Sequence, residues 1–519
     1  MINFKSYIDA KKELTTQEKV GQLFMPAAFI NDSEEEILQI EKLIKEECIG
    51  GLCFFHSRAS AATNFEGKKQ VLYNENSYER LKYLIARYQK VTEYPLLIAI
   101  DAEWGLAMRI ENTPQYPYAV TLGALQNRLD LIFKVGQYIG LDCKKANIHW
   151  NLGPVVDIND NPDNPVIGYR SFGDKKEEVT EKAKAFLQGM QSVGVLNSLK
   201  HFPGHGDTAV DSHLDLPTIK KSKETLLDNE LYPYQKLIKE DIDSIMVGHL
   251  SVPALGNGRN TSATVSKEII QGILREELGF DGVVISDALN MHAVSKLYPK
   301  KGELEWNAFE AGNDMLCFAE NPQEGIGFIS EKSNQTKIEK SFERIWKLKE
   351  KVFFEKSPQI LDTKNYSKLI KELAVESLSI FHGNENIIKE FRSDSVELLQ
   401  IGNPKNNYFF EGLTKEIKSI KGENVLIALF PPKMKPKGNF GLSDLELDLL
   451  KNTLNSKNSI LYIFGNPYVL NLFDFTKTKA TLLVYQDFKA FQENATAHFM
   501  GTTSAKGKLP VKIKNGKNG

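Results

Sequence analysis

From about residue 20 to residue 320, the chain repeats one pattern: a short apolar run, a polar or small residue at its end, a loop and an amphipathic stretch. Apolar runs separated by helices favour a parallel sheet that is covered on both faces. Eight such units in roughly 300 residues predict an α/β fold that begins with a (β/α)8 TIM-like barrel, with an open doubly wound sheet as the alternative. The eight predicted strands are residues 21–25, 50–55, 96–101, 149–157, 195–201, 244–249, 282–287 and 313–318.

Polar residues stand at the carboxyl ends of several of these runs. Asp101 ends the third run and His201 the fifth, while His249 and Asp287 end the sixth and the seventh. In a barrel these ends converge on one face, and active sites are built on that face. The pattern therefore indicates an enzyme.

A second region follows the predicted barrel. A charged helical stretch over residues 338–355 leads into Ser357 and Pro358, which mark a boundary. From about residue 374, apolar runs at 396–401, 425–430, 459–464 and 481–485 alternate with helical stretches such as 445–454, and they predict a smaller α/β sandwich. We expect a catalytic barrel domain over residues 1–355, a linker over 356–373 and a C-terminal domain over 374–519.

Composition and charge argue against several classes of function. The 519 residues include 65 Lys and Arg against 67 Asp and Glu, and a net charge of −2 gives no footprint for nucleic acid or an anionic membrane. No stretch approaches the roughly 18 apolar residues that span a bilayer, and the start lacks a basic region followed by an apolar run. The four widely spaced cysteines form no CxxC and fit reduced core thiols. We therefore expect a cytoplasmic protein.

The densest group of reactive side chains lies at residues 200–208 (KHFPGHGDT) and 211–213 (DSH). Pro and Gly exclude a helix here, so the segment is predicted to be a loop after a strand. Asp211 and His213 suit general acid–base work, because a carboxylate orients an imidazole and favours its charged form. The alternatives are a metal site, formed by His201, His205 and His213 with Asp207 or Asp211, and a purely structural loop.

These residues, together with 284–289 (VISDAL), resemble the β-N-acetylglucosaminidase branch of glycoside hydrolase family 3. Residues 101–109 (DAEWGLAMR) resemble that family's D-x-E-G-G-x-V-x-R, and residues 151–157 (NLGPVVD) and 170–173 (RSFG) follow in the family's order. The resemblance is strong over residues 15–350 and weak in the second region. It implies a two-domain enzyme of the peptidoglycan-recycling type.

The resemblance also implies a role for individual residues. Asp287 is then the nucleophile that forms a covalent glycosyl-enzyme, and His213, supported by Asp211, is the general acid and base. The residues that would bind the sugar are Asp101, Arg109, Arg170, Lys200 and His201. For Arg109 the alternative is a salt bridge to Asp101 or Glu103 that never meets a ligand.

The function that follows is a retaining exo-β-N-acetylglucosaminidase acting on terminal β-linked N-acetylglucosamine of muropeptides or chitooligosaccharides. No cofactor or metal is expected, and the partner is a small carbohydrate. The alternatives are a family-related β-glucosidase or glycoside phosphorylase, a metal-dependent hydrolase that uses the histidine cluster, and a non-catalytic sugar-binding protein.

Overall fold

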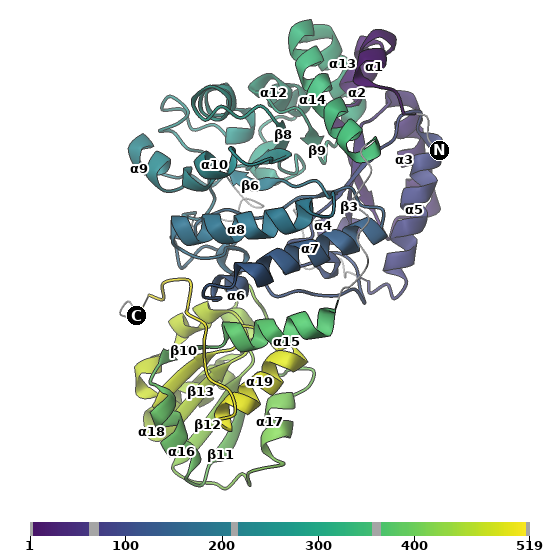
Figure 1. Ribbon diagram of the computed structural model, residues 1–519. Coiled ribbons are helices and arrows are strands. Elements are labelled where there is room, and N and C mark those ends of the chain that lie inside the picture. Colours follow the sequence, from purple (N-terminus) through teal and green to yellow (C-terminus); the bar gives the residue numbers. More distant parts are fainter. Residues whose placement is uncertain (1–3, 62–71, 209–215, 355–364, 515–519) are drawn as a thin grey trace. The chain divides into compact units, whose positions relative to one another are not determined.

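The structure is a computed structural model that describes residues 4–61, 72–208, 216–354 and 365–514. The chain divides into two compact units, and both draw on separate stretches of sequence (Figure 1). Unit 1 comprises Met1–Gln115, Phe133–Asp157 and Ala183–Asp362. Unit 2 comprises Tyr116–Ile132, Ile158–Lys182 and Thr363–Gly519.

The described residues of unit 1 form three parallel sheets. β1 pairs with β9, the strands β2-β3-β4-β5 form a second sheet in that order, and β6-β7-β8 form a third. The bounds are β1 Phe24–Met25, β2 Ala27–Phe29, β3 Gly51–Phe55, β4 Leu97–Ile100, β5 Trp150–Asn151, β6 Leu199–Phe202, β7 Ser244–Val247, β8 Val283–Ser286 and β9 Leu316–Cys317. Every residue in these strands is buried, as parallel strands covered on both faces require.

The predicted α/β character with parallel strands is confirmed, and each of the eight predicted runs contains a strand. β2 is an additional strand, separated from β1 by Pro26. Proline has no N–H to donate, but its carbonyl still accepts the N–H of Cys53 at 3.0 Å. The ladder therefore continues past a residue at which the sequence pattern placed a break.

Helices follow the strands of this half of the chain. The longest, α14, covers most of the predicted charged stretch at 338–355. The α-helices described up to residue 354 are α1 Tyr7–Glu13, α2 Thr16–Gly21, α3 Glu34–Glu47, α4 Arg58–Ala61, α5 Ser77–Val91, α6 Ala119–Gly123, α7 Leu129–Lys145, α8 Lys176–Gln191, α9 Lys223–Asp228, α10 Tyr232–Leu237, α11 His292–Ser295, α12 Glu303–Ala311, α13 Pro322–Lys332 and α14 Gln335–Phe353. Among the described residues, no helix has both the length and the apolarity needed to cross a bilayer.

The described part of unit 2 is built around a sheet in the order β10-β14-β13-β12-β11, in which β10 runs antiparallel to β14 and the other neighbours pair in parallel. Its strands are β10 Ser379–His382, β11 Glu397–Ile401, β12 Asn424–Leu429, β13 Asn458–Ile463 and β14 Ala480–Leu483. Its helices after residue 365 are α15 Tyr366–Ser377, α16 Glu385–Arg392, α17 Tyr408–Leu413, α18 Asp444–Ser456 and α19 Lys489–Phe499. All four predicted runs of this region contain a strand, whereas β10 was not predicted because three of its four residues are only half-buried.

Earlier segments of the chain pack within the same unit. The Gln486 amide donates to Thr121 Oγ1 at 2.8 Å, and the rings of Tyr116 and Tyr366 meet edge to face with centroids 5.4 Å apart. The N–H of Lys508 donates to the carbonyl of Ala124 at 2.9 Å. The domain bounds expected from the sequence, 1–355, 356–373 and 374–519, stay predictions.

Candidate active site

Four of the predicted site residues lie at strand ends of unit 1. Asp101 directly follows β4, Lys200 and His201 lie within β6, and Asp287 directly follows β8. The carboxyl ends of parallel strands point the same way, so the backbone presents these side chains at the corresponding ends of their sheets.

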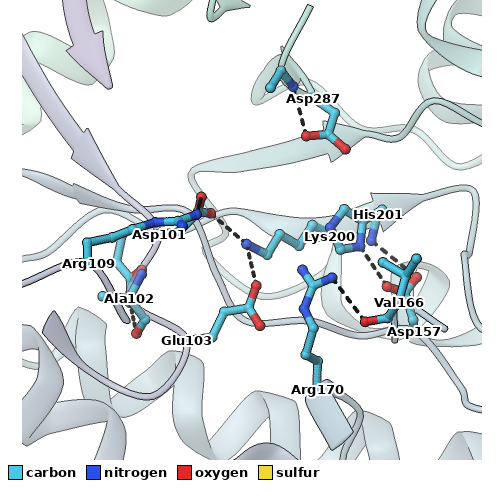
Figure 2. Close-up of polar contacts among 12 residues, drawn as sticks. Asp101, Ala102, Glu103, Arg109, Asp157, Val166, Arg170, Lys200, His201 and Asp287 are labelled. Carbon is cyan, nitrogen blue, oxygen red and sulfur yellow. Dashed lines mark hydrogen bonds and ion pairs between the residues drawn. The ribbon is translucent and has the colours of Figure 1, made fainter. Parts of the chain in front are cut away.

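Lys200 joins two carboxylates in this region. Its ammonium donates to Asp101 Oδ1 and pairs with Glu103 Oε1, both at 2.8 Å, although the Lys200 side chain is only 2% exposed (Figure 2). Asp101 also accepts from Nη2 of Arg109 at 2.7 Å through its other oxygen. Of the two salt bridges considered for Arg109, the structure therefore has the one to Asp101.

The Asp101 side chain is held in its ionised form. Burial alone would raise the pKa of this carboxyl, but the attraction of Lys200 and Arg109 outweighs burial and holds the pKa well below its usual range. Asp101 is therefore an ionised acceptor at any physiological pH, flanked by two fixed donors. This arrangement suits the binding of vicinal hydroxyl groups.

His201 is oriented by a buried carboxylate. Its Nδ1 donates to Oδ2 of Asp157 at 2.7 Å (Figure 2). Oδ1 of the same carboxylate accepts the backbone N–H of His201 at 3.2 Å and of His205 at 2.8 Å. Burial opposes the charge of Asp157, but His201 and these hydrogen bonds lower its pKa below the ordinary value. One carboxylate thus holds the end of β6 and the first turn of the loop after it.

Asp287 is a half-buried carboxylate on a firmly held backbone. Its N–H donates to the Val247 carbonyl at 3.0 Å, and its Oδ1 accepts the N–H of Ala288 at 2.8 Å. The carbonyl of Ala288 in turn accepts from Nε2 of His249 at 2.9 Å, and Nδ1 of His249 lies 2.7 Å from Thr264 Oγ1. The N–H and the carbonyl of Ala288 are therefore both hydrogen-bonded, and this limits the directions that the Asp287 side chain takes.

Arg170 belongs to unit 2. It ends the short helix η2 Gly168–Arg170, and its Nη1 donates to the Val166 carbonyl at 3.4 Å (Figure 2). Its role as a sugar-binding residue stays a prediction.

Asp211 and His213 lie outside the described residues, so their predicted roles rest on the sequence. The segments on either side of them are described. On the near side, Thr208 Oγ1 lies 2.7 Å from Nδ1 of His205. On the far side, Lys221 pairs with Asp207 at 3.2 Å and with the buried Glu230.

The metal-site alternative involves His201 and His205. Their Nδ1 atoms contact Asp157 and Thr208, respectively. Within the described ranges, no group of three or more His, Cys, Asp or Glu side chains is arranged to hold a metal ion. The four cysteines are free, as expected from their spacing.

Sequence reasoning assigned no role to three residues that shape this region. Glu103 and Asp157 lie inside the motifs that carry the family resemblance, and His249 ends a predicted strand. Their position at or near predicted strand ends was the feature that could have identified them. The sequence does not show which side chains they contact, because partners such as Asp157 and His201 are 44 positions apart.

Comparison with known proteins identifies the family of these motifs. Residues 15–348 match the family described as Glycosyl hydrolase family 3 N terminal domain. Beta-hexosaminidase A of Pseudoalteromonas piscicida is 31% identical over 381 residues, which cover 68% of this chain and 60% of that protein. Beta-hexosaminidase of Tolumonas auensis is 32% identical over 266 residues, which cover 50% of this chain and 77% of that protein. The resemblance stated from the sequence is thereby confirmed.

Among solved structures, a glycoside hydrolase family 3 β-N-acetylglucosaminidase from Paenibacillus sp. str. FPU-7 superposes with a TM-score of 0.76. The superposition covers 96% of this chain and 99% of that one at 24% sequence identity. At this identity the likeness shows a shared fold.

Proposed function

This chain belongs to glycosyl hydrolase family 3 and is a glycoside hydrolase, and from that premise we propose that it is a retaining exo-β-N-acetylglucosaminidase. Its substrate is then a carbohydrate with a terminal β-linked N-acetylglucosamine, of muropeptide or chitooligosaccharide type. The observation that carries the proposal is the half-buried Asp287 carboxylate, held at the end of β8 by its own backbone and by Ala288. Matches to β-hexosaminidases support the choice of sugar.

The proposal includes a closed (β/α)8 barrel. β1 pairs with β9, and a single parallel bridge joins Ile285 of β8 to Met315, the residue before β9. A second bridge joins Trp150 of β5 to Leu196, shortly before β6. Since β1 and β2 are separated only by Pro26, these links support one continuous ring of strands.

In the first half of the reaction, an oxygen of Asp287 attacks the anomeric carbon of the sugar. The bond from that carbon to the leaving oxygen breaks, and the imidazolium of His213 gives its proton to that oxygen. Asp211 stabilises the imidazolium before the transfer. The product is an ester between Asp287 and the sugar.

In the second half, neutral His213 takes a proton from water, and the oxygen of that water attacks the anomeric carbon. The ester bond breaks and restores the Asp287 carboxylate, so two inversions give net retention. This scheme differs from the common pair of carboxylates in using histidine as the proton carrier. An imidazole with an ordinary pKa of about 6.5 serves both directions near neutral pH.

The sugar is held by groups that do not react. Asp101 accepts from ring hydroxyls, while Lys200, Arg109 and His201 donate to ring oxygens. The Lys200 and Arg109 contacts to Asp101 pre-orient three of these groups before substrate arrives. Arg170 adds a further donor.

We place the enzyme in the cytoplasm, where recycled wall fragments would be its substrates.

The test is Asp287→Asn, which keeps the size of the side chain and removes the nucleophilic oxygen. We expect kcat to fall at least about a thousandfold while the melting temperature stays near that of the wild type. The matched control is Asp281→Asn, at the opposite end of β8, where the carboxylate is 93% exposed and pairs with Arg344. A folded Asp287→Asn enzyme with the activity of the control would reject the assignment.

A further inference from the structure

The loop that carries Arg170 is held by a small set of buried amides. It begins in the chain just after Asp157 and belongs wholly to unit 2. The N–H of Asn159 donates to the Gly173 carbonyl at 2.9 Å, and its side-chain Oδ1 accepts the N–H of Gly168 at 3.1 Å. Asn159 thus ties the two ends of the loop together and holds the first residue of the helix η2, in which Arg170 is the last.

The other end of the Asn159 amide reaches the C-terminal part of the chain. Its Nδ2 donates to the hydroxyl of Tyr468, and the two residues are only 2% and 4% exposed. Burial raises the pKa of Tyr468, so its hydroxyl stays protonated at all working pH values. The Asn159 amide is therefore a bridge with one end on Tyr468 and the other on the Arg170 helix.

Tyr468 is itself fixed in place. It belongs to the helix η6 Pro467–Leu472, five residues after β13, and its N–H donates to the Asn466 side chain at 2.9 Å. The Asn466 amide donates in turn to the Met434 carbonyl at 2.7 Å. The bridge to Asn159 consequently starts from a residue that hydrogen bonds hold in place shortly after β13.

The C-terminal segment adds a second attachment to the same loop. The N–H of Asp174 donates to the Pro510 carbonyl at 3.0 Å, and a Cβ on Gly173 would come within 2.8 Å of that oxygen. Lys514 pairs with Asp163 at 2.5 Å on the surface. Residues from 468 to 514 therefore contact the loop at its start, middle and end.

From these contacts we infer that Tyr468, acting through Asn159, is a positioning residue for Arg170. The inference rests on the proposed function, because it uses the role of Arg170 as a donor to the sugar. Tyr468 touches no substrate. It sets the angle of the η2 helix, and that angle sets the direction of the guanidinium.

The experiment compares Tyr468→Phe with Tyr462→Phe. Tyr462 lies on β13, is fully buried, and shares a hydrogen bond of 2.8 Å with His498, far in the hydrogen-bond network from Asn159. Both variants lose one buried hydroxyl, but only Tyr468→Phe loses the bridge. We expect Tyr468→Phe to raise KM for an aryl N-acetylglucosaminide by about fivefold to tenfold with kcat within about twofold, and Tyr462→Phe to change neither.

A double-variant cycle separates positioning from general destabilisation. Arg170→Ala should raise KM by at least as much as Tyr468→Phe, and the combination should be no worse than Arg170→Ala alone. The inference would be overturned if the KM increases of the two single variants multiplied in the double variant, or if folded Tyr468→Phe had a wild-type KM. If Tyr468→Phe does not fold, Asn159→Ser removes the bridge together with the contact to Gly168 and should raise KM at least as much; a wild-type KM there overturns the inference too.

A readout without substrate distinguishes failure of this inference from failure of the proposed function. Amide exchange at Gly168 should be at least about fivefold faster in Tyr468→Phe than in the wild type or Tyr462→Phe. Unchanged exchange would contradict the bridge. Faster exchange in an enzyme that hydrolyses no N-acetylglucosaminide would contradict the proposed function. Faster exchange in an active enzyme that is indifferent to Arg170→Ala would contradict the sugar-binding role of Arg170, and either result would remove the role of Tyr468 in binding.

Discussion

Two buried lysines are accommodated in different ways, and the difference shows at the scale of single residues. Lys200 is 2% exposed and meets two carboxylates. Lys349 is fully buried, and its Nζ donates to the neutral side chain of Gln22 at 2.5 Å. An amide offsets less of the cost of burying a charge than carboxylates do, so burial lowers the pKa of Lys349 to about 7.

Lys349 therefore makes stability depend on pH. An unfolded lysine titrates near 10.4, so between about pH 7 and pH 10 the unfolded chain binds a proton that the folded one does not, and stability rises with pH. We expect Lys349→Met to be more stable than the wild type by roughly 4 kcal/mol at pH 7, with a gap that narrows by up to about 1.4 kcal/mol per unit as pH rises. Urea unfolding at pH 7, 8 and 9 measures the gap; a gap independent of pH would refute this account of Lys349.

The role of His213 as proton donor is tested by comparing substrates whose leaving groups differ in basicity. A proton is needed most when the leaving oxygen is basic, so His213→Ala should slow the hydrolysis of an N-acetylglucosamine disaccharide by at least about a hundredfold and that of a p-nitrophenyl glycoside far less. Steady-state kcat on the two substrates gives the comparison. His382→Ala, in β10 of unit 2, is the control and should leave both rates unchanged. Equal losses on the two substrates would mean that His213 acts structurally.

The sequence predicted where four candidate site residues lie in the fold, because strand ends are recognisable. Asp101, Lys200, His201 and Asp287 each end an apolar run or stand one residue before its end, and the structure has each at or within the corresponding strand end. The sequence did not predict which of these side chains pair with one another. For Arg109 two carboxylate partners were equally consistent with the sequence, and only the fold brings Asp101 to 2.7 Å.

At the scale of elements, the parts of α7 and α8 that belong to unit 1 approach closely where both helices have glycine. A Cβ on Gly136 of α7 would lie 2.1 Å from the Phe186 carbonyl, and one on Gly189 of α8 would lie 2.1 Å from the Phe133 carbonyl. The two backbones are therefore in contact through a matched pair of glycines. Any side chain there forces the helices apart.

Gly136→Ala should consequently destabilise the protein by about 1–3 kcal/mol, the cost of overpacking a tight contact. Gly327→Ala in α13 is the control, because nothing lies within 4 Å of a Cβ at that position. Alanine there should stabilise the helix by up to about 1 kcal/mol. Thermal unfolding of the two variants measures both; stabilisation by Gly136→Ala would contradict the close contact.

Elements were predictable where one physical signal dominates. The eight runs of the first half and the four of the second each contain a strand because buried parallel strands are apolar throughout. β2 was missed because Pro26 reads as a break, and β10 because an edge strand that is half-exposed has no continuous apolar run.

At the scale of the whole molecule, unit 2 combines segments that are far apart in the sequence. Gln486 and Thr121 are 365 positions apart, and Tyr468 and Asn159 are 309 apart. A pattern with periods of two or 3.6 residues carries no information about such contacts. For this reason a role for residues after 374 could not be predicted from the sequence, and the role that we infer for Tyr468 rests on the contacts of the Arg170 loop.

The central claim is tested most directly by p-nitrophenol release from the β-N-acetylglucosaminide and the β-glucoside, side by side, in phosphate-free buffer with EDTA and again with added phosphate. We expect the N-acetyl substrate to be strongly preferred, with no effect of EDTA or phosphate. A rate that rises with phosphate would indicate a phosphorylase, and preference for the glucoside a β-glucosidase. Loss of activity with EDTA, or no activity on either substrate, would contradict the Asp287 and His213 mechanism.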